Sequence, residues 1–102
     1  MKENNYFPLG TVVTLKDDIK TFMIIGYAPM DSIEKNQVYD YSACLYPEGL
    51  LSADQILMFN HEDIEKVKYI GYEDEESDTF LKKLKDLLNN KEQLLQETEK
   101  NQ

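Results

Sequence analysis

Cys44 and His61 are the two side chains of this sequence that could form a nucleophile and its base. They are the one cysteine and the one histidine of the chain. A catalytic cysteine needs an electropositive setting that favours its thiolate. Cys44 instead lies within a run that alternates like a β-strand, in a chain with a formal net charge of −9. We therefore expect a packed thiol, no catalytic residue and no enzymatic activity; a small hydrolase using this pair is the least favoured alternative.

A cluster that could hold a metal ion begins at His61, with Glu62, Asp63 and Glu65 close behind it. A zinc site needs several ligands at fixed spacing, and the sequence offers no second histidine. The same stretch also reads as a short helical turn with Asn60 as its N-cap. We therefore expect no metal. Because the four glycines are scattered singly, we also expect no phosphate-binding loop and no cofactor.

Tyrosine is frequent in the sequence, with seven residues in 102. Tyr27, Tyr39, Tyr41, Tyr46 and Tyr72 fall within predicted strands or at their ends. Tyrosine is common in binding hot spots because it buries a large area and keeps a polar tip. In a curled sheet, these side chains could line a groove for a peptide or a helix. They could equally be half-buried core residues of a one-sided sheet, and the sequence leaves both interpretations open.

The end of the chain predicts one long amphipathic helix from about residue 77 to 100. Ser77 or Asp78 can cap it, and acidic residues crowd its first turn, where the helix dipole favours them. We expect the half through Leu88 to pack on the sheet. The half with Leu94 and Leu95 would project and bind a partner, or fray in solution; a homodimer through this helix is one form of such binding. The apolar stripe of the whole predicted helix has helical spacing. It consists of Phe80, Leu81, Leu84, Leu87, Leu88, Leu94 and Leu95.

The elements that position these residues divide into a β-rich part, residues 1–76, and a helical part, residues 77–102, within a single domain overall. Runs 11–16, 21–27, 39–46 and 67–72 predict strands, whereas 50–59 is ambiguous between strand and helical turn. The run 21–27 is apolar on both faces, which predicts a central strand, and Gly26 indicates a bend or a bulge. The fold class is α+β: a small, strongly bent antiparallel sheet or an SH3-like barrel of four to five strands, with a C-terminal amphipathic helix.

Composition limits the classes of partner. The chain has 20 acidic residues and 11 basic ones, and every basic residue is lysine. Nucleic-acid binding relies on clustered cations and often on arginine, so we expect no nucleic-acid partner. A single cysteine forms no intrachain disulfide and fits a reducing cytoplasm. No apolar run approaches the ~18 residues of a membrane span, so we expect a cytoplasmic protein without direct membrane insertion.

Five segments of the sequence occur in a recognisable order. They are residues 8–16 (PLGTVVTLK), 23–27 (MIIGY), 39–49 (YDYSACLYPEG), 59–64 (FNHEDI) and 70–72 (IGY), the last followed by a run of acids. Together they resemble a small family, labelled only as a domain of unknown function, in Gram-positive bacteria. Genes of that family lie beside LXG polymorphic toxins and their small helical partners in type VII (Esx) secretion loci. The resemblance covers about residues 8–80.

The resemblance implies a non-enzymatic accessory role: a cytoplasmic chaperone or adaptor that binds its cognate LXG toxin, or another secretion-system protein, before export. It implies no catalytic site. Shared residues such as Tyr41, Tyr46, Pro47 and 60–63 would define the fold or bind the partner. The alternative is an immunity protein that inhibits a cognate toxin, since a small acidic protein suits a basic cleft. The candidate partner-binding residues are Tyr27, Tyr39, Tyr41, Tyr46, Leu94 and Leu95.

Overall fold

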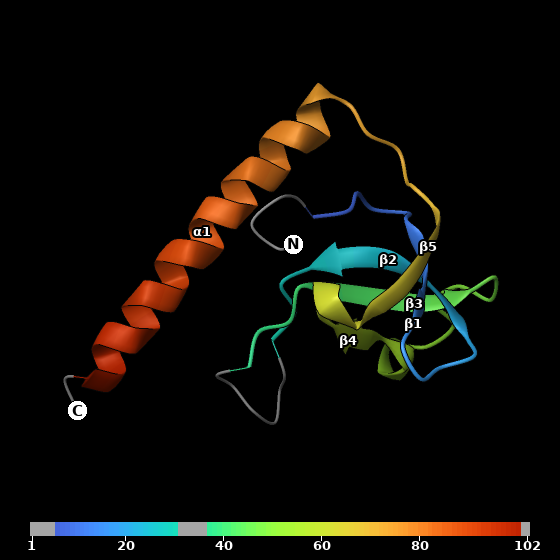
Figure 1. The fold of residues 1–102 in the computed structure, drawn as a ribbon, viewed down its shortest axis with the longest axis horizontal. Coiled ribbons are helices and arrows are strands. Elements are labelled where there is room, and N and C mark those ends of the chain that lie inside the picture. Colours follow the sequence, from blue (N-terminus) through green and yellow to red (C-terminus); the bar gives the residue numbers. More distant parts are fainter. Residues whose placement is uncertain (1–5, 31–36, 101–102) are drawn as a thin grey trace. The chain divides into compact units, whose positions relative to one another are not determined.

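The computed structural model describes residues 6–30 and 37–100, and the side chains of the C-terminal helix as far as Asn89. The chain forms two compact units, residues 1–72 and residues 73–102, each of which is described by itself. The first unit contains all the strands, and the second contains the helix (Figure 1).

The first unit is a five-stranded antiparallel sheet with the strand order β4-β3-β2-β1-β5. Each strand lies beside its neighbour in sequence except β5, which returns to pair with β1 (Figure 1). The strands are β1 (Val12–Leu15), β2 (Thr21–Tyr27), β3 (Tyr41–Tyr46), β4 (Leu57–Phe59) and β5 (Ile64–Tyr69). β2 is central, as its two apolar faces predict. The predicted α+β class is confirmed, and the sheet stays open, with β4 and β5 as its edges.

Interruptions in the strand register lie in β2 and β5. The pairing of β2 with β3 shifts between Ile24 and Gly26, and the pairing of β1 with β5 shifts twice. Such bulges bend a strand and increase its twist. A methyl group at Gly26 would lie 2.5 Å from the Ser42 Oγ, so a larger residue would displace that hydroxyl. The bend or bulge predicted at Gly26 is therefore confirmed.

The core lies on one face of the sheet. Alternate residues of a strand point to opposite faces, and the pairs Val13–Phe22, Ile24–Ala43 and Tyr41–Phe59 bring apolar side chains together on the same side. We call this the core face and the opposite side the outer face. The buried core cluster is Val13, Leu15, Phe22, Ile24, Tyr41, Ala43 and Phe59.

The segment between β3 and β5 contains two short 3₁₀ turns. The ambiguous run 50–59 resolves into η1 (Ala53–Gln55) followed by β4. The turn predicted at 60–63 is confirmed as η2 (His61–Asp63), where the Asp63 carboxylate accepts a hydrogen bond from the Asn60 N–H at 2.9 Å. This turn leads directly into β5, which therefore begins at Ile64, before the predicted position 67, and ends at Tyr69.

The second unit is the helix α1 (Glu75–Lys100), which begins two residues earlier than predicted. Its cap is Asp74, not Ser77 or Asp78. The Asp74 Oδ1 accepts a hydrogen bond from the Ser77 N–H, and the Ser77 Oγ accepts one from the Asp74 N–H, both at 2.9 Å. This reciprocal pair satisfies two backbone donors that the first turn cannot satisfy itself.

The predicted stripe of α1 is described only in part. Leu81, Leu84 and Leu88 are half-buried, whereas Phe80 and Leu87 are exposed. The side chains of Leu94 and Leu95 lie outside the described residues, so their role and the packing of the helix stay predictions. No helix in the described part of the chain has both the length and the apolar character to cross a membrane.

Candidate protein-binding surface

Cys44 and His61, the sequence-level candidates for a nucleophile and its base, lie on different sides of the sheet. Tyr41 and Cys44 are three residues apart in β3, so their side chains point to opposite faces. The Tyr41 hydroxyl lies 2.8 Å from the His61 Nδ1, which places the imidazole on the side of Tyr41. Cys44 is buried on the other side. The structure therefore does not bring thiol and imidazole together.

The residues around His61 tie two loops to each other. The Asp40 Oδ2 accepts a hydrogen bond from the His61 backbone N–H at 2.8 Å, and the Asn60 Oδ1 accepts one from the Asp40 N–H at 3.1 Å. These bonds join the start of β3 to the turn between β4 and β5. Among the residues with described positions, no three His, Cys, Asp or Glu side chains form a group that could hold a metal ion.

Tyr41 is the centre of an aromatic cluster on the core face and has no exposed surface. Its ring lies 5.6 Å from Phe59, 5.9 Å from His61 and 6.1 Å from Tyr27, measured between ring centroids. Burial raises the pKa of the Tyr41 hydroxyl well above its usual range. The hydrogen bond from the Phe7 backbone lowers this pKa, but by less than burial raises it. Burial also raises the pKa of Tyr27 to about 12. Both hydroxyls therefore stay protonated at neutral pH.

The N-terminal arm, defined as residues 6–8, lies on this cluster. The Tyr41 hydroxyl accepts a hydrogen bond from the Phe7 N–H at 3.0 Å, and the Tyr27 hydroxyl donates one to the Phe7 carbonyl at 2.6 Å. The Phe7 ring stacks on His61 with a centroid distance of 5.0 Å and an interplanar angle of 16°. The cluster is thus covered by the chain's own first described residues.

The four candidate tyrosines do not share one surface. Tyr27 and Tyr41 belong to the core face, and Tyr27 and Tyr39 are both half-buried. Tyr46 is five residues beyond Tyr41 in β3, so it points to the outer face, where 49% of it is exposed. The core interpretation therefore holds for Tyr41, and Tyr46 is the predicted residue that is available to a partner.

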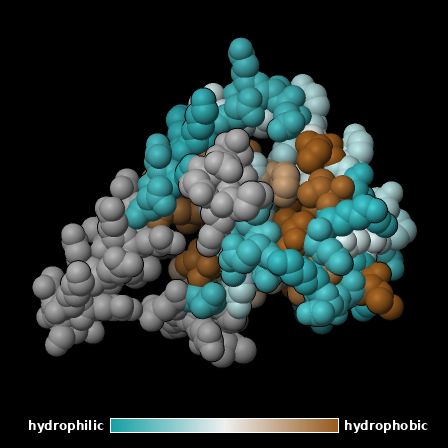
Figure 2. All heavy atoms as spheres, viewed as in Figure 1, coloured by the Kyte–Doolittle hydropathy of each residue, from teal (hydrophilic) through white to brown (hydrophobic). Residues whose placement is uncertain are grey.

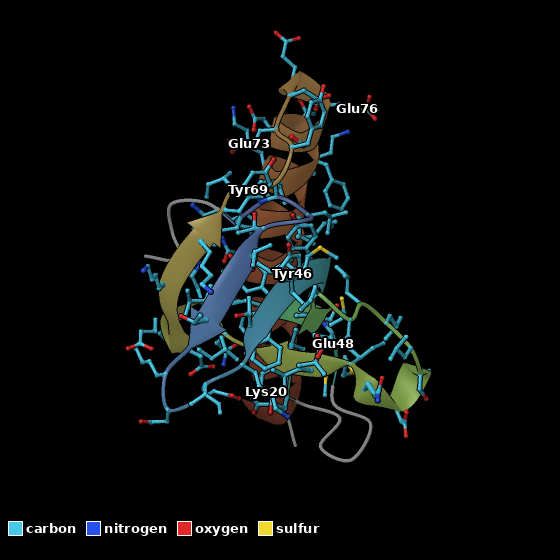
Figure 3. The ribbon with its side chains drawn as sticks, turned by 90° about the vertical axis from the view of Figure 1, so that its right-hand side faces the viewer. Lys20, Tyr46, Glu48, Tyr69, Glu73 and Glu76 are labelled. Atoms are coloured by element: carbon cyan, nitrogen blue, oxygen red, sulfur yellow. The ribbon has the colours of Figure 1, made fainter. Side chains whose placement is uncertain are left out.

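The outer face combines exposed aromatic residues with lysines. The strand register gives two rows across four strands, about 14 Å wide at the usual strand spacing: Lys66–Thr14–Thr21–Tyr46 and Tyr69–Val12–Met23–Cys44. Val12 and Cys44 of the second row are buried, so the exposed part of the outer face does not include them. Tyr69, at the end of β5, is 66% exposed and is labelled with Tyr46 in Figure 3. Sequence reasoning missed Tyr69, although its exposure follows from its place in an edge strand.

The charge of the outer face is opposite to that of the whole chain. Lys66 and Lys68 are exposed in β5, and the Lys68 Nζ reaches across β1 to the Thr21 Oγ1 at 3.5 Å. The five strands contain one acidic residue, Glu65, which is exposed and which, like Lys68, falls at a shift in register. The other acids of the sheet unit lie in its loops. The outer face is therefore a cationic and aromatic surface on a chain of net charge −9.

Apolar surface also occurs elsewhere on the sheet unit. Leu50, Leu51 and Ile56 are exposed between β3 and β4, and Ile70 and Tyr72 are exposed after β5. Figure 2 shows brown apolar side chains at several places among teal polar ones. The outer face differs from these sites because regular strands fix its aromatic side chains in a known register.

A family described as a domain of unknown function (DUF4176) matches residues 6–80. The match includes the N-terminal arm, all five strands and the first turns of α1, and it leaves out most of the helix. No curated protein and no solved structure matches the chain. The matched residues agree with the extent of the resemblance expected from the five ordered segments.

Proposed function

The chain belongs to the DUF4176 family, and from that premise we propose that it is a non-enzymatic, protein-binding accessory factor. In the form we favour, it is a cytoplasmic chaperone or adaptor for an LXG toxin that is exported by type VII secretion. The ordered segments that resemble the toxin-associated family support the toxin as partner. The observation that carries the binding role is the outer face, where Tyr46 of β3 and Tyr69, Lys66 and Lys68 of β5 are exposed.

The outer face suits the recognition of an apolar surface with an acidic rim. Tyrosine buries its ring against apolar groups while its hydroxyl can still bond to water or to the partner. The flexible stems of the two lysines can lie along apolar surface with their charges at the edge. A toxin segment covered in this way would be kept from aggregating before export, which is the action of a chaperone.

Co-expression of the tagged chain with the toxin encoded beside its gene tests this function. We expect the two proteins to co-elute in size-exclusion chromatography and the toxin to stay in the soluble fraction. The double substitution Tyr46→Ser/Tyr69→Ser should abolish co-elution, because aromatic anchors of an interface typically contribute about 2 kcal/mol or more each. Tyr72→Ser is the matched control, since Tyr72 is 79% exposed but follows the last strand.

Two results of this experiment would contradict the proposal. Failure of the unsubstituted chain to bind any part of the toxin would remove the chaperone function. Equal binding by the folded double variant and by the Tyr72→Ser control would leave a toxin-binding protein but exclude the outer face as its binding surface.

The net charge of −9 favours a second candidate, an immunity protein that inhibits the toxin. The acidic residues at the start of α1 would face a basic active-site cleft. The bound toxin region separates the two candidates. A chaperone should bind segments outside the toxic domain, whereas an immunity protein should bind the isolated toxic domain and stop its activity.

A further inference from the structure

We propose that Tyr27, Tyr41 and His61 form a seat for an extended peptide segment in which two aromatic residues precede a proline. The N-terminal arm, with the sequence Tyr6-Phe7-Pro8, occupies this seat in the structure. When the arm leaves, the seat takes a partner's segment of the same chemistry. The seat lies on the core face, so this proposal is independent of the outer face.

The seat binds the backbone of a single residue from both sides. The Phe7 N–H donates to the Tyr41 hydroxyl at 3.0 Å, and the Phe7 carbonyl accepts from the Tyr27 hydroxyl at 2.6 Å. In an antiparallel sheet, a neighbouring strand satisfies the same two groups of a residue. Here two side-chain hydroxyls replace that strand. Backbone bonds of this kind supply affinity in peptide recognition, and side-chain contacts supply specificity.

The contacts of the arm's side chains select aromatic residues. The Phe7 ring stacks on His61 at 5.0 Å. The Tyr6 ring stands edge-on to Tyr27 at 5.8 Å and to Tyr41 at 5.7 Å. Aromatic rings prefer these stacked and edge-to-face arrangements at such distances. Consecutive aromatic residues are therefore the chemistry that fits both positions.

The arm has a fixed end at Pro8. The Pro8 carbonyl accepts hydrogen bonds from the Thr11 hydroxyl at 2.7 Å and from the Thr11 N–H at 3.2 Å. The Gly71 N–H in turn donates to the Thr11 hydroxyl at 3.0 Å. Phe7 belongs to no strand, and its backbone bonds go to side chains. The arm can therefore lift before Pro8 without breaking the ladder of the sheet.

The hydroxyl of Tyr41 is oriented by the rest of the protein. It lies 2.8 Å from the His61 Nδ1, a hydrogen-bond partner that does not belong to the arm. The His61 backbone is fixed by the Asp40 carboxylate. A seat whose polar groups are set in advance binds with less loss of conformational freedom.

Occupation by the arm competes with any partner segment. A tethered segment acts at an effective concentration of about 1 mM, so a free peptide should bind the unsubstituted chain weakly. Disabling the arm should expose the seat. The probe is a fluorescent peptide with the sequence of residues 6–10 (YFPLG), and its binding is followed by anisotropy with the full-length chain.

The full-length variant Tyr6→Ser/Phe7→Ser should bind this peptide at least about tenfold more tightly than the unsubstituted chain does. Leu9→Ser is the matched control, because Leu9 is 52% exposed and lies next to the arm. It should bind like the unsubstituted chain. A peptide with alanine in place of its phenylalanine should bind the arm variant at least about tenfold less well. No binding to the folded arm variant, or equal binding of both peptides, would overturn the proposal.

Hydrogen exchange in the unsubstituted chain tests the same proposal if the arm variant does not fold. The Ile24 N–H bonds to the Thr11 carbonyl in the central strand at 2.9 Å. The Phe7 N–H should exchange about 100-fold faster than this one and independently of denaturant, because local opening is enough to release it. Equal exchange rates with the same denaturant dependence would show that the arm leaves only on global unfolding, and the seat would then not exist.

Discussion

At the scale of single residues, hydrogen bonds account for a group of polar side chains in which the sequence suggests a metal or acid–base site. His61 and Asp63 belong to the stretch that resembles a metal or acid–base cluster, and Asn60 precedes it as the predicted N-cap. In the structure, each instead satisfies a specific backbone or side-chain group near the start of β3 or within η2. A buried polar group without a partner would cost about 1–3 kcal/mol. Stability alone is therefore sufficient reason for these residues to be present.

The buried tyrosines should make the fold sensitive to alkali. The pKa of Tyr27 rises from 10.0 to about 12 in the folded protein, and that of Tyr41 rises too, in both cases because burial disfavours the phenolate. The unfolded chain loses these protons near pH 10, whereas the folded protein keeps them. The contribution of these two protonated tyrosines to the free energy of unfolding is therefore fully present below pH 10. It is lost as the pH rises toward 12.

Urea unfolding at a series of pH values from 8 upward measures this effect. We expect the urea concentration at the unfolding midpoint to decrease as the pH is raised above 10. The decrease should be less steep in Tyr27→Phe, because this variant has no proton to lose at that position. Tyr69→Phe is the control, because Tyr69 is largely exposed and should keep the slope of the unsubstituted chain. Identical slopes in all three proteins would contradict the assignment of the high pKa to Tyr27.

At the scale of elements, the strands could be predicted from local pattern, but their ends could not. The run Thr21–Tyr27 is apolar on both faces, and β2 has these same bounds in the centre of the sheet. The start of β5 depends on the capping of η2, an interaction between Asn60 and Asp63 that strand periodicity does not reveal. Local patterns thus locate an element, while caps and turns decide where it begins.

The candidate surface was harder to predict than the sheet. Tyr41 and Tyr46 have the same residue type and lie in the same strand, yet one is buried and the other is about half exposed. Their difference depends on the N-terminal arm, which covers the core face, and on the parity of their positions in β3. The arm acts over 34 positions in sequence, a separation at which spacing rules give no information.

The helix cap gives a prediction at the scale of elements. Asp74→Ala removes the acceptor of the Ser77 N–H, and loss of such a cap typically costs about 1 kcal/mol of helix stability. We expect fraying of the first turn of α1, seen as smaller helical Cα shifts at residues 75–78. Asp86→Ala makes the same chemical change in the exposed middle of the helix, and it should leave those shifts unaltered. Equal shifts in both variants would mean that Asp74 does not cap the helix.

The whole molecule is electrostatically asymmetric. Its net charge is −9, yet β5 presents Lys66 and Lys68, and Glu65 is the one acidic residue of the five strands. A partner with an acidic rim would be repelled by most of the surface and attracted to the outer face. Such a distribution orients an encounter more than it strengthens the final complex. In the proposed function, charge would therefore direct such a partner to this face even though several other apolar patches exist.

Reversing the charge of the outer face tests this asymmetry. If the proposed toxin partner is correct, we expect the association rate of Lys66→Glu/Lys68→Glu with it to fall at least about tenfold at low salt, because long-range steering is lost. The difference from the unsubstituted chain should shrink near 1 M salt, where the Debye length is about 3 Å. Lys82→Glu/Lys83→Glu makes the same change of net charge in α1 and should have a much smaller effect. If both variants slowed association equally, net charge and not the outer face would govern the encounter, and the toxin would have to bind elsewhere on the chain.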